Sequence, residues 1–366
     1  MNSWILVAGL ILQEAEPAEQ PVRKQDPELQ QKLEDLERLI LDVEERLKEM
    51  ERRLAQVTSA NPLNVLNPTL TVIGNSLYRR DDREVFLDGD PSQPRIDDQL
   101  NVREVELDLR AAVDPFVDGI AILSLESEVS GEFETGVEEF FLKIKSLPIP
   151  GWEEPPLGTL IKLGRMRTEF GTNNLLHLHD LPQSNRPLVI EEFLGEEGHI
   201  ANGISARMFL PSPGSTALQL TLQALQGGSA EVAQDGDHPA YLGNLHLFLP
   251  LGSAHSLDAS LIGFYGTNDA AGRDQSRVGS FDWWYRWKPL RQGEWKSLLM
   301  GGQLFAAEHE FPVDPADPSL GSEREEPLGY TLWTQYQLAR NLYLGARWDR
   351  TDFLRDDSQE HERVQP

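Results

Sequence analysis

The feature that most constrains this chain is an alternation of apolar and polar residues that recurs from about residue 69 to residue 352. In NVREVELDLRAAVD (residues 101–114), for example, Val105, Leu107 and Leu109 alternate with charged residues. A period of two gives an extended strand one apolar face and one polar face. Thirteen such segments lie near residues 69–79, 101–113, 116–127, 136–147, 158–170, 202–210, 216–226, 241–250, 256–266, 278–288, 295–307, 328–338 and 341–352. The chain is therefore expected to be mainly β.

The connections between these segments alternate in length. They are short at 211–215, 251–255 and 289–294, and long at 171–201 and 308–327. A soluble β-sandwich gives no reason for this alternation, whereas an outer-membrane barrel has tight periplasmic turns at one end and longer extracellular loops at the other. The Trp and Tyr residues of the later segments also suit the aromatic girdles of such a barrel. We therefore predict an antiparallel transmembrane β-barrel in a bacterial outer membrane.

A region of a different kind precedes the barrel, which is expected to occupy residues 69–366. The apolar run from Trp4 to Leu12 is too short to cross a bilayer as a helix, but it fits the hydrophobic part of a secretory signal. We therefore interpret residues 1–20 as a signal peptide. No Lys or Arg precedes the run, and a frayed soluble N-terminus is the alternative.

A heptad seam follows within residues 28–58. Its apolar positions, in alternating steps of four and three, are Leu29, Leu33, Leu36, Ile40, Val43, Leu47, Met50, Leu54 and Val57. A strict seam of two residues in seven is typical of a coiled coil, whereas a helix packed on its own domain shows a wider apolar stripe. We predict a coiled-coil oligomerisation helix in the periplasm, joined to the barrel by a linker at 59–68. Leu and Ile at both seam positions leave dimer and trimer open.

The composition excludes several classes of site and partner. The chain has no cysteine, which excludes disulfides, thiolate metal sites and a cysteine nucleophile. Its formal net charge of −27 argues against a nucleic-acid partner. The sequence has no G-x-S-x-G motif, phosphate-binding glycine loop or H-E-x-x-H helix. We therefore expect no enzyme and no cofactor, and the expected partners are outer-membrane lipid and small hydrophilic solutes or ions.

The longest connection, residues 171–201, would be the third extracellular loop. It is rich in Leu, Val, Ile and Phe, and is too apolar to extend into water. Long connections without regular structure are usually functional. We expect this loop to fold into the barrel and to narrow its lumen as a constriction.

Charged residues of the neighbouring segments would face this loop across the lumen. Lys143 and Lys145 alternate with apolar residues and should point inward, and Arg165 and Arg167 would do so if Gly164 marks a β-bulge. The candidate constriction set is Lys143, Lys145, Lys162, Arg165, Arg167, Arg186, Arg207, Glu191 and Glu192. Such charges attract anions or orient dipolar solutes. The alternative is that they only pair with one another inside a wet lumen.

His177, His179 and Asp180 are candidate metal ligands within the same loop. On an extended segment the two imidazoles would project to one side, as two ligands do. No third ligand or outer partner can be located from the sequence, and loop polarity explains these residues as well. We therefore expect no metal.

The runs GRMRTEFG (164–171), NNLLHLHDLP (173–182) and NRPLVIEEFLGEEG (185–198) resemble the corresponding part of a bacterial outer-membrane barrel family related to the phosphate-selective porins. The resemblance covers most of residues 60–352. It implies a porin-like barrel behind a periplasmic coiled coil, and it favours a trimer. Some family members are labelled TonB-dependent receptors, but residues 21–67 leave no room for a plug domain.

Two further expectations concern completeness and function. Thirteen strands would leave the chain ends on opposite sides of the membrane, whereas bacterial single-chain barrels have an even number of strands. We interpret RDDSQEHERVQP (355–366) as a charged, loop-like tail and expect a barrel truncated at its C-terminus, with about sixteen strands when complete. The expected function is passive diffusion of small hydrophilic solutes, with an anion preference. The alternatives are a coiled-coil envelope tether, a TonB-type receptor fragment and a barrel enzyme.

Overall fold

The computed structural model describes residues 68–78, 80, 85–86, 95–96, 99–127, 133–226, 228, 232–233, 237–269, 272–314 and 320–365. The chain divides into the units Met1–Val65 and Leu66–Pro366, and the described residues all belong to the second unit. The predicted signal peptide and coiled coil lie outside the described residues, as does nearly all of the linker.

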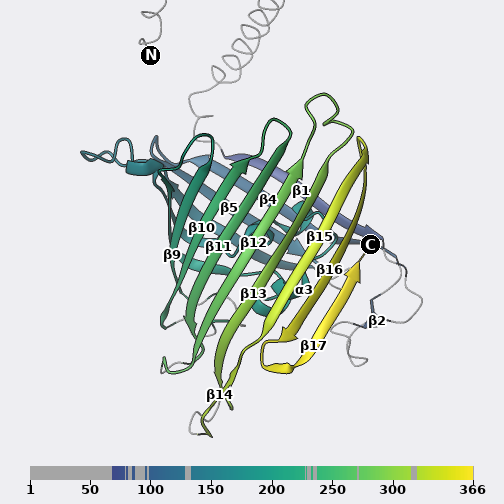
Figure 1. Cartoon of the computed structure of the whole chain (residues 1–366). Coiled ribbons are helices and arrows are strands. Elements are labelled where there is room, and N and C mark those ends of the chain that lie inside the picture. Colours follow the sequence, from purple (N-terminus) through teal and green to yellow (C-terminus); the bar gives the residue numbers. More distant parts are fainter. Residues whose placement is uncertain are drawn as a thin grey trace, which may run out of the picture. The chain divides into compact units, whose positions relative to one another are not determined.

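One antiparallel sheet of fifteen strands dominates the second unit (Figure 1). Its order is β1 (Thr69–Tyr78), β4 (Leu100–Ala112), β5 (Val117–Glu126), β6 (Glu134–Ile144), β7 (Leu160–Arg167), β8 (Ile200–Leu210), β9 (Ala217–Gln226), β10 (Pro239–Pro250), β11 (His255–Thr267), β12 (Gln275–Trp287), β13 (Leu298–Pro312), β15 (Leu328–Ala339), β16 (Leu342–Phe353) and β17 (Asp356–Gln365). β14 (Ser322–Glu325) pairs with β13 outside this path, and β2 (Val85–Phe86) and β3 (Arg95–Ile96) form a separate two-stranded sheet. The predicted mainly β, antiparallel barrel class is confirmed.

Side chains alternate between the two faces of this sheet, as the period of two requires. In the β10–β11 pair, Leu245 lies opposite Leu261, and these side chains are 39% and 63% exposed. The adjacent pair, Asn244 and Ile262, is buried on the other face. The outer face therefore carries exposed apolar side chains, which is the kind of surface that lipid covers in a barrel.

The C-terminal tail corrects the interpretation of residues 355–366 as loop-like. β17 pairs with β16, with Trp348 opposite Val364 and Asp349 opposite Arg363. Its outward residues include Glu360 and Glu362, which bind Arg350 and the Trp348 indole nitrogen on β16. Because charges occupy both faces of β17, the strand lacks the apolar period that identified the others. β17 and β14 account for the two strands of the fifteen-stranded sheet beyond the thirteen predicted, and β2 and β3 were not predicted either.

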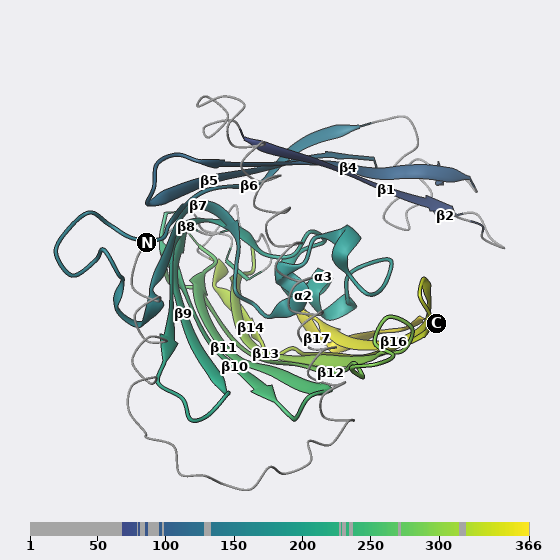
Figure 2. The ribbon, with the colours of Figure 1, turned by 90° about the horizontal axis from the view of Figure 1, so that it is seen from above.

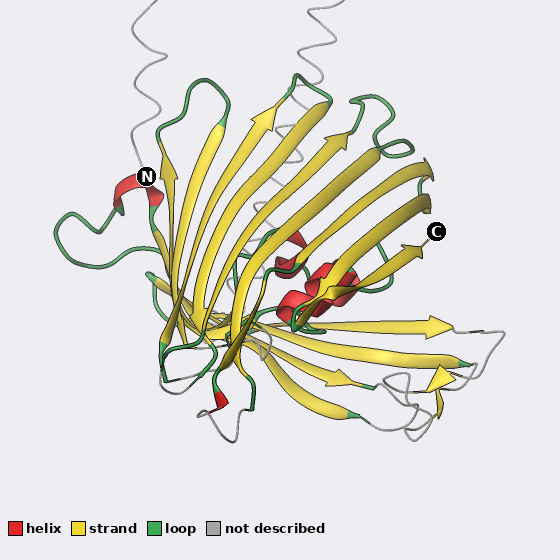
Figure 3. Cartoon of the chain, turned by 60° about the horizontal axis from the view of Figure 1, so that its bottom comes forward, coloured by secondary structure: helices red, strands yellow, loops and turns green. Residues whose placement is uncertain are grey.

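The β7–β8 connection lies on the concave side of the curved sheet (Figure 2). The connection spans residues 168–199. Its residues 171–199, hereafter the inserted loop, contain α2 (Thr172–Leu175), η4 (Leu178–Asp180) and α3 (Leu188–Leu194). Figure 3 shows these helices against the inner face of the strands. Another short helix, η3 (Pro156–Gly158), lies in the β6–β7 connection. Within the described residues, no helix is long and apolar enough to cross a membrane.

Candidate functional site

The inserted loop is attached to the sheet through an apolar core on one side. Val189, Ile190, Phe193 and Leu194 of α3 are at most 1% exposed. They belong to a cluster whose other members come from inward positions of the strands and from the connections between strands, namely Phe170, Ala201, Leu225, Val232, Ala233, Ala240, Leu242, Ile262, Phe264, Val278, Phe305 and Leu354. The loop is thus packed as the interior of a domain is packed, and the sheet bends around it.

The start of the inserted loop is held by two polar side chains of β12 and β13. The backbone N–H and the hydroxyl of Thr172 both donate to Asp282 Oδ2, each at 2.8 Å. Gln303 Nε2 donates to the carbonyl of Phe170 at 2.6 Å. Gly171 has φ +100°, and a Cβ there would lie 2.6 Å from Gln303 Nε2, so only glycine fits this approach.

The middle of the inserted loop is held by two arginines near the C-terminal edge of the sheet. Arg347 on β16 donates to the Asn185 carbonyl at 2.7 Å and to the Arg186 carbonyl at 3.1 Å. Arg363 on β17 pairs with Glu191 at 3.2 Å and also donates to the Arg186 carbonyl. These bonds satisfy backbone oxygens that would otherwise be buried without donors.

The histidines of the inserted loop face carboxylates on β4 and β6. His177 Nδ1 lies 3.0 Å from Glu138 Oε2 and 3.1 Å from Glu106 Oε2. Burial of the imidazole lowers the pKa of His177, but Glu106, Glu138 and Glu139 raise it by more, to about 11. His177 is therefore an imidazolium that joins the loop to the wall, and Glu138 is also paired with Arg167.

A β-bulge explains why this acidic wall was not predicted. The β5–β6 register pairs Ile122 with Glu139 and Leu123 with Val137, so Glu138 is the extra residue. Glu138 and Glu139 are both buried, although neighbours on a regular strand point to opposite faces. The sequence shows the acidic pair but contains no signal for the bulge.

Four members of the predicted constriction set form a group of their own, Lys143, Lys145, Lys162 and Arg207, hereafter the basic strip. Lys143 pairs in register with Lys162, whose Nζ lies 4.9 Å from the centre of the Phe141 ring. Lys145 pairs with Asp118 at 2.7 Å. All four lie at the ends of strands next to the short connections, whereas the inserted loop leaves from the opposite end of β7. The structure thus places the loop beside carboxylates rather than beside these lysines.

The other five residues of the predicted constriction set do not lie together. Arg167 is 2% exposed and bonds with Glu138. Gly164 does not shift the β6–β7 register, so Arg165 pairs with Phe140, which is 64% exposed on the outer face. The expectation that Arg165 points inward is therefore wrong. Members on the inserted loop lie near β16 and β17, where Glu192 accepts the Leu354 N–H, Glu191 pairs with Arg363 and Arg186 lies beside Arg347.

Comparison with known proteins gives limited similarity. No family model matches the chain. An uncharacterized protein of Aquifex aeolicus (strain VF5) is 34% identical over 128 residues, which are 35% of this chain and 24% of that protein. The matched region therefore spans about a quarter of the relative's length.

Similar solved structures are outer-membrane proteins. The outer membrane channel DcaP of Acinetobacter baumannii is 11% identical at a TM-score of 0.41, with 81% of this chain and 95% of that chain covered. An anion-selective porin from Comamonas acidovorans is 10% identical at a TM-score of 0.41, with 78% of this chain and 89% of that chain covered. In-vitro folded OmpT of Vibrio cholerae, in its trimer form, is 10% identical at a TM-score of 0.43, with 81% of this chain and 79% of that chain covered. At these low scores the fold class rests on the sheet order of the chain itself.

Proposed function

We propose that the protein is a porin-like channel of the outer membrane, through which small hydrophilic solutes diffuse passively. The observation that carries this proposal is the up-and-down antiparallel sheet with an apolar outer face and a loop packed against its inner face. Outer-membrane barrels combine these features, and an inward loop sets the width of the passage. The inserted loop is accordingly proposed as the narrowest zone.

The basic strip supports a mild anion preference. Within the basic strip, Asp118 neutralises Lys145. Lys143 and Lys162, which lie opposite each other on β6 and β7, are therefore left to attract anions. The carboxylates that face the inserted loop act in the opposite sense, but Glu138 and Glu139 are balanced by Arg167 and His177. Charges inside a barrel act more strongly than charges at an exposed mouth, where salt screens them.

Reversal potentials in planar bilayers test both parts of this proposal. The full-length protein should conduct and should favour anions, more clearly at high salt. Replacing Lys143 and Lys162 together by Gln should shift the reversal potential toward cation preference. Lys288→Gln with Lys296→Gln is the matched control, because it removes the same charge from exposed positions beside a short connection. Absence of conductance would overturn the channel, and cation preference that the first pair does not alter would overturn the role of the basic strip.

We further propose that the barrels associate through the heptad seam between Leu29 and Val57, with a trimer favoured. Porins of the resembling family commonly pack as trimers, and the seam is long enough for a stable coiled coil. Sedimentation of a peptide spanning residues 27–60 tests this, and a monomer at high concentration would contradict it.

A further inference from the structure

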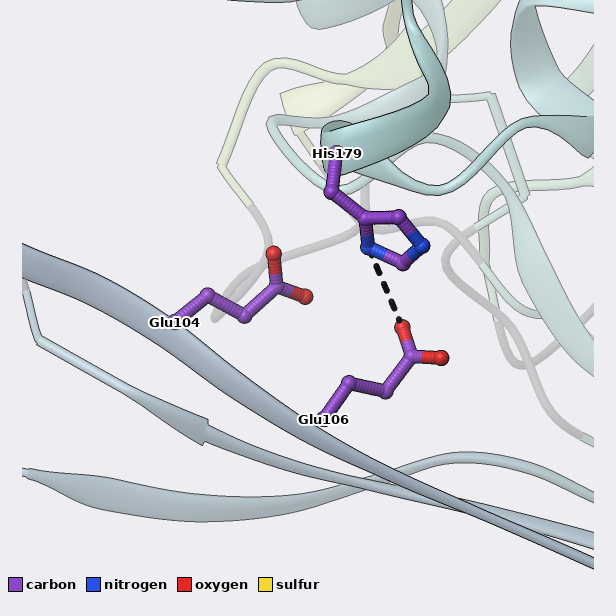
Figure 4. A group of neighbouring side chains, drawn as sticks. All are labelled: Glu104, Glu106 and His179. Carbon is purple, nitrogen blue, oxygen red and sulfur yellow. Dashed lines mark ion pairs between the residues drawn. The ribbon is translucent and has the colours of Figure 1, made fainter. Parts of the chain in front are cut away.

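Three side chains with metal-ligating atoms meet where the inserted loop faces β4. Glu104 and Glu106 are two residues apart on β4, so both point to the inner face, and His179 approaches them from η4 (Figure 4). One ligand atom from each residue lies within 4.8 Å of the other two. His179 Nδ1 is 3.6 Å from Glu106 Oε2.

Two of these residues carry a buried polar atom that lacks a hydrogen-bond partner among the described residues, Glu104 Oε2 and His179 Nδ1. The third ligand atom, Glu106 Oε2, lies 3.1 Å from His177 Nδ1. Glu104 and Glu106 are only 4% and 2% exposed. Buried carboxylate oxygens without donors are costly, and two neighbouring carboxylates also repel each other. A bound cation removes both penalties.

The adjacent group of Glu106, Glu138 and His177 also has ligand spacing, but its charges are already balanced. Glu138 Oε2 pairs with Arg167 Nη2 and lies 3.0 Å from His177 Nδ1. Glu104, on the His179 side of the cluster, is therefore the carboxylate that still lacks a partner among the described residues.

We propose that Glu104, Glu106 and His179 bind one divalent metal ion of the Zn²⁺ type, which fastens the inserted loop to β4. Two carboxylate oxygens and one imidazole nitrogen suit Zn²⁺, with water as a fourth ligand, whereas Mg²⁺ and Ca²⁺ prefer oxygen ligands alone. Tetrahedral ligands of Zn²⁺ lie about 3.4 Å apart. The distance of 3.6 Å between His179 Nδ1 and Glu106 Oε2 is already close to this value, whereas the other separations, all within 4.8 Å, shorten by up to about 1.4 Å on binding. Any proton on a ligand atom is released to solvent.

Two neighbouring features fit this assignment. His179 Nε2 lies 3.6 Å from Asp180 Oδ2, which is the outer carboxylate that commonly orients a metal-bound imidazole. Glu104 also lines a cavity of about 340 Å³ between the inserted loop and the strands β4 and β5. This cavity gives an ion a route to the ligands.

Calorimetric titration of the full chain in detergent, with ZnCl₂ added to metal-free protein, tests the proposal. We expect one saturable site per chain. Glu104→Gln and His179→Ala should each weaken Zn²⁺ binding at least tenfold, and MgCl₂ should give no saturable binding. His246→Ala is the matched control, because His246 lies 3.3 Å from Asp258 and belongs to neither group of metal-ligating side chains among the described residues, so its loss should leave Zn²⁺ binding unchanged.

A chain that takes up no Zn²⁺ at a single site, or that binds it equally after Glu104→Gln and His179→Ala, would overturn the proposal. If either variant fails to fold, Asp180→Asn keeps the test open, because it alters only the outer partner and should still weaken binding about tenfold. The metal site does not rest on the proposed channel. Calorimetry can show no Zn²⁺ binding by a protein that still conducts in a bilayer, and Zn²⁺ can bind to a protein that does not conduct. The failure of one proposal is therefore distinguishable from the failure of the other.

Discussion

The two sides of the inserted loop are held in different ways. The α3 side is apolar, and its Val189 and Phe193 are fully buried against the sheet. The other side is polar, and its histidines and backbone carbonyls bind charged groups of β4, β6, β16 and β17. Apolar burial is strong but non-directional, whereas hydrogen bonds and ion pairs fix one geometry. The apolar side therefore supplies most of the attachment energy, and the polar side sets the position of the loop.

The largest effect should come from the apolar side. Phe193→Ala removes a fully buried ring whose centre lies 5.3 Å from that of Phe305. Large-to-small changes of this kind lower the free energy of unfolding by about 3–5 kcal/mol. Urea titration of the folded protein in detergent measures this change. Phe133→Ala, at a position that is 49% exposed, should cost under about 1 kcal/mol. An equal loss of unfolding free energy in the two variants would mean that α3 does not contribute to the hydrophobic core.

The next largest loss of stability should come from removing an arginine that holds the polar side of the inserted loop. Arg347→Met removes the donor to the Asn185 and Arg186 carbonyls and one cation beside buried Asp349. Breaking a buried pair while leaving its partner costs about 3 kcal/mol. The backbone amide hydrogens of residues 182–191 should exchange faster with solvent, in line with this loss of free energy. Arg350→Met is the control on the same strand, because its pair with Glu360 is exposed to solvent and its loss should leave the free energy of unfolding almost unchanged. Unchanged exchange in the Arg347 variant would show that the loop keeps its position without this contact.

The same comparison explains what could be predicted from sequence. The strands were recognisable wherever an apolar face alternated with a polar one, as at Leu107 and Leu109. The inward fold of the loop followed from its own Leu, Val and Phe content. These are local properties, and they depend on composition and period alone.

The polar partners of the loop could not be predicted in this way. Arg347 binds a carbonyl 161 residues away in sequence, and no local pattern encodes such a distance. The bulge at Glu138 changes which side chains face inward, and the charges of β17 conceal its period. Glu104 and Glu106 stood on the polar face of a correctly predicted strand. Only the fold shows that this face meets His177 and His179.

The smallest effect should be a pH dependence on the histidine side. Folding raises the pKa of His177 from 6.5 to about 11, so the folded protein holds a proton that the unfolded chain releases. The stabilisation is complete below pH 6.5 and is lost progressively as pH rises toward 11. Hydrogen exchange of residues 172–180, corrected for its intrinsic pH dependence, should therefore quicken between pH 7 and pH 9. His177→Gln keeps a hydrogen-bond donor but cannot titrate, and should remove this dependence. A slope that persists in His177→Gln would assign the proton to another group, and a flat profile in the unaltered protein would show that the imidazolium does not hold the loop.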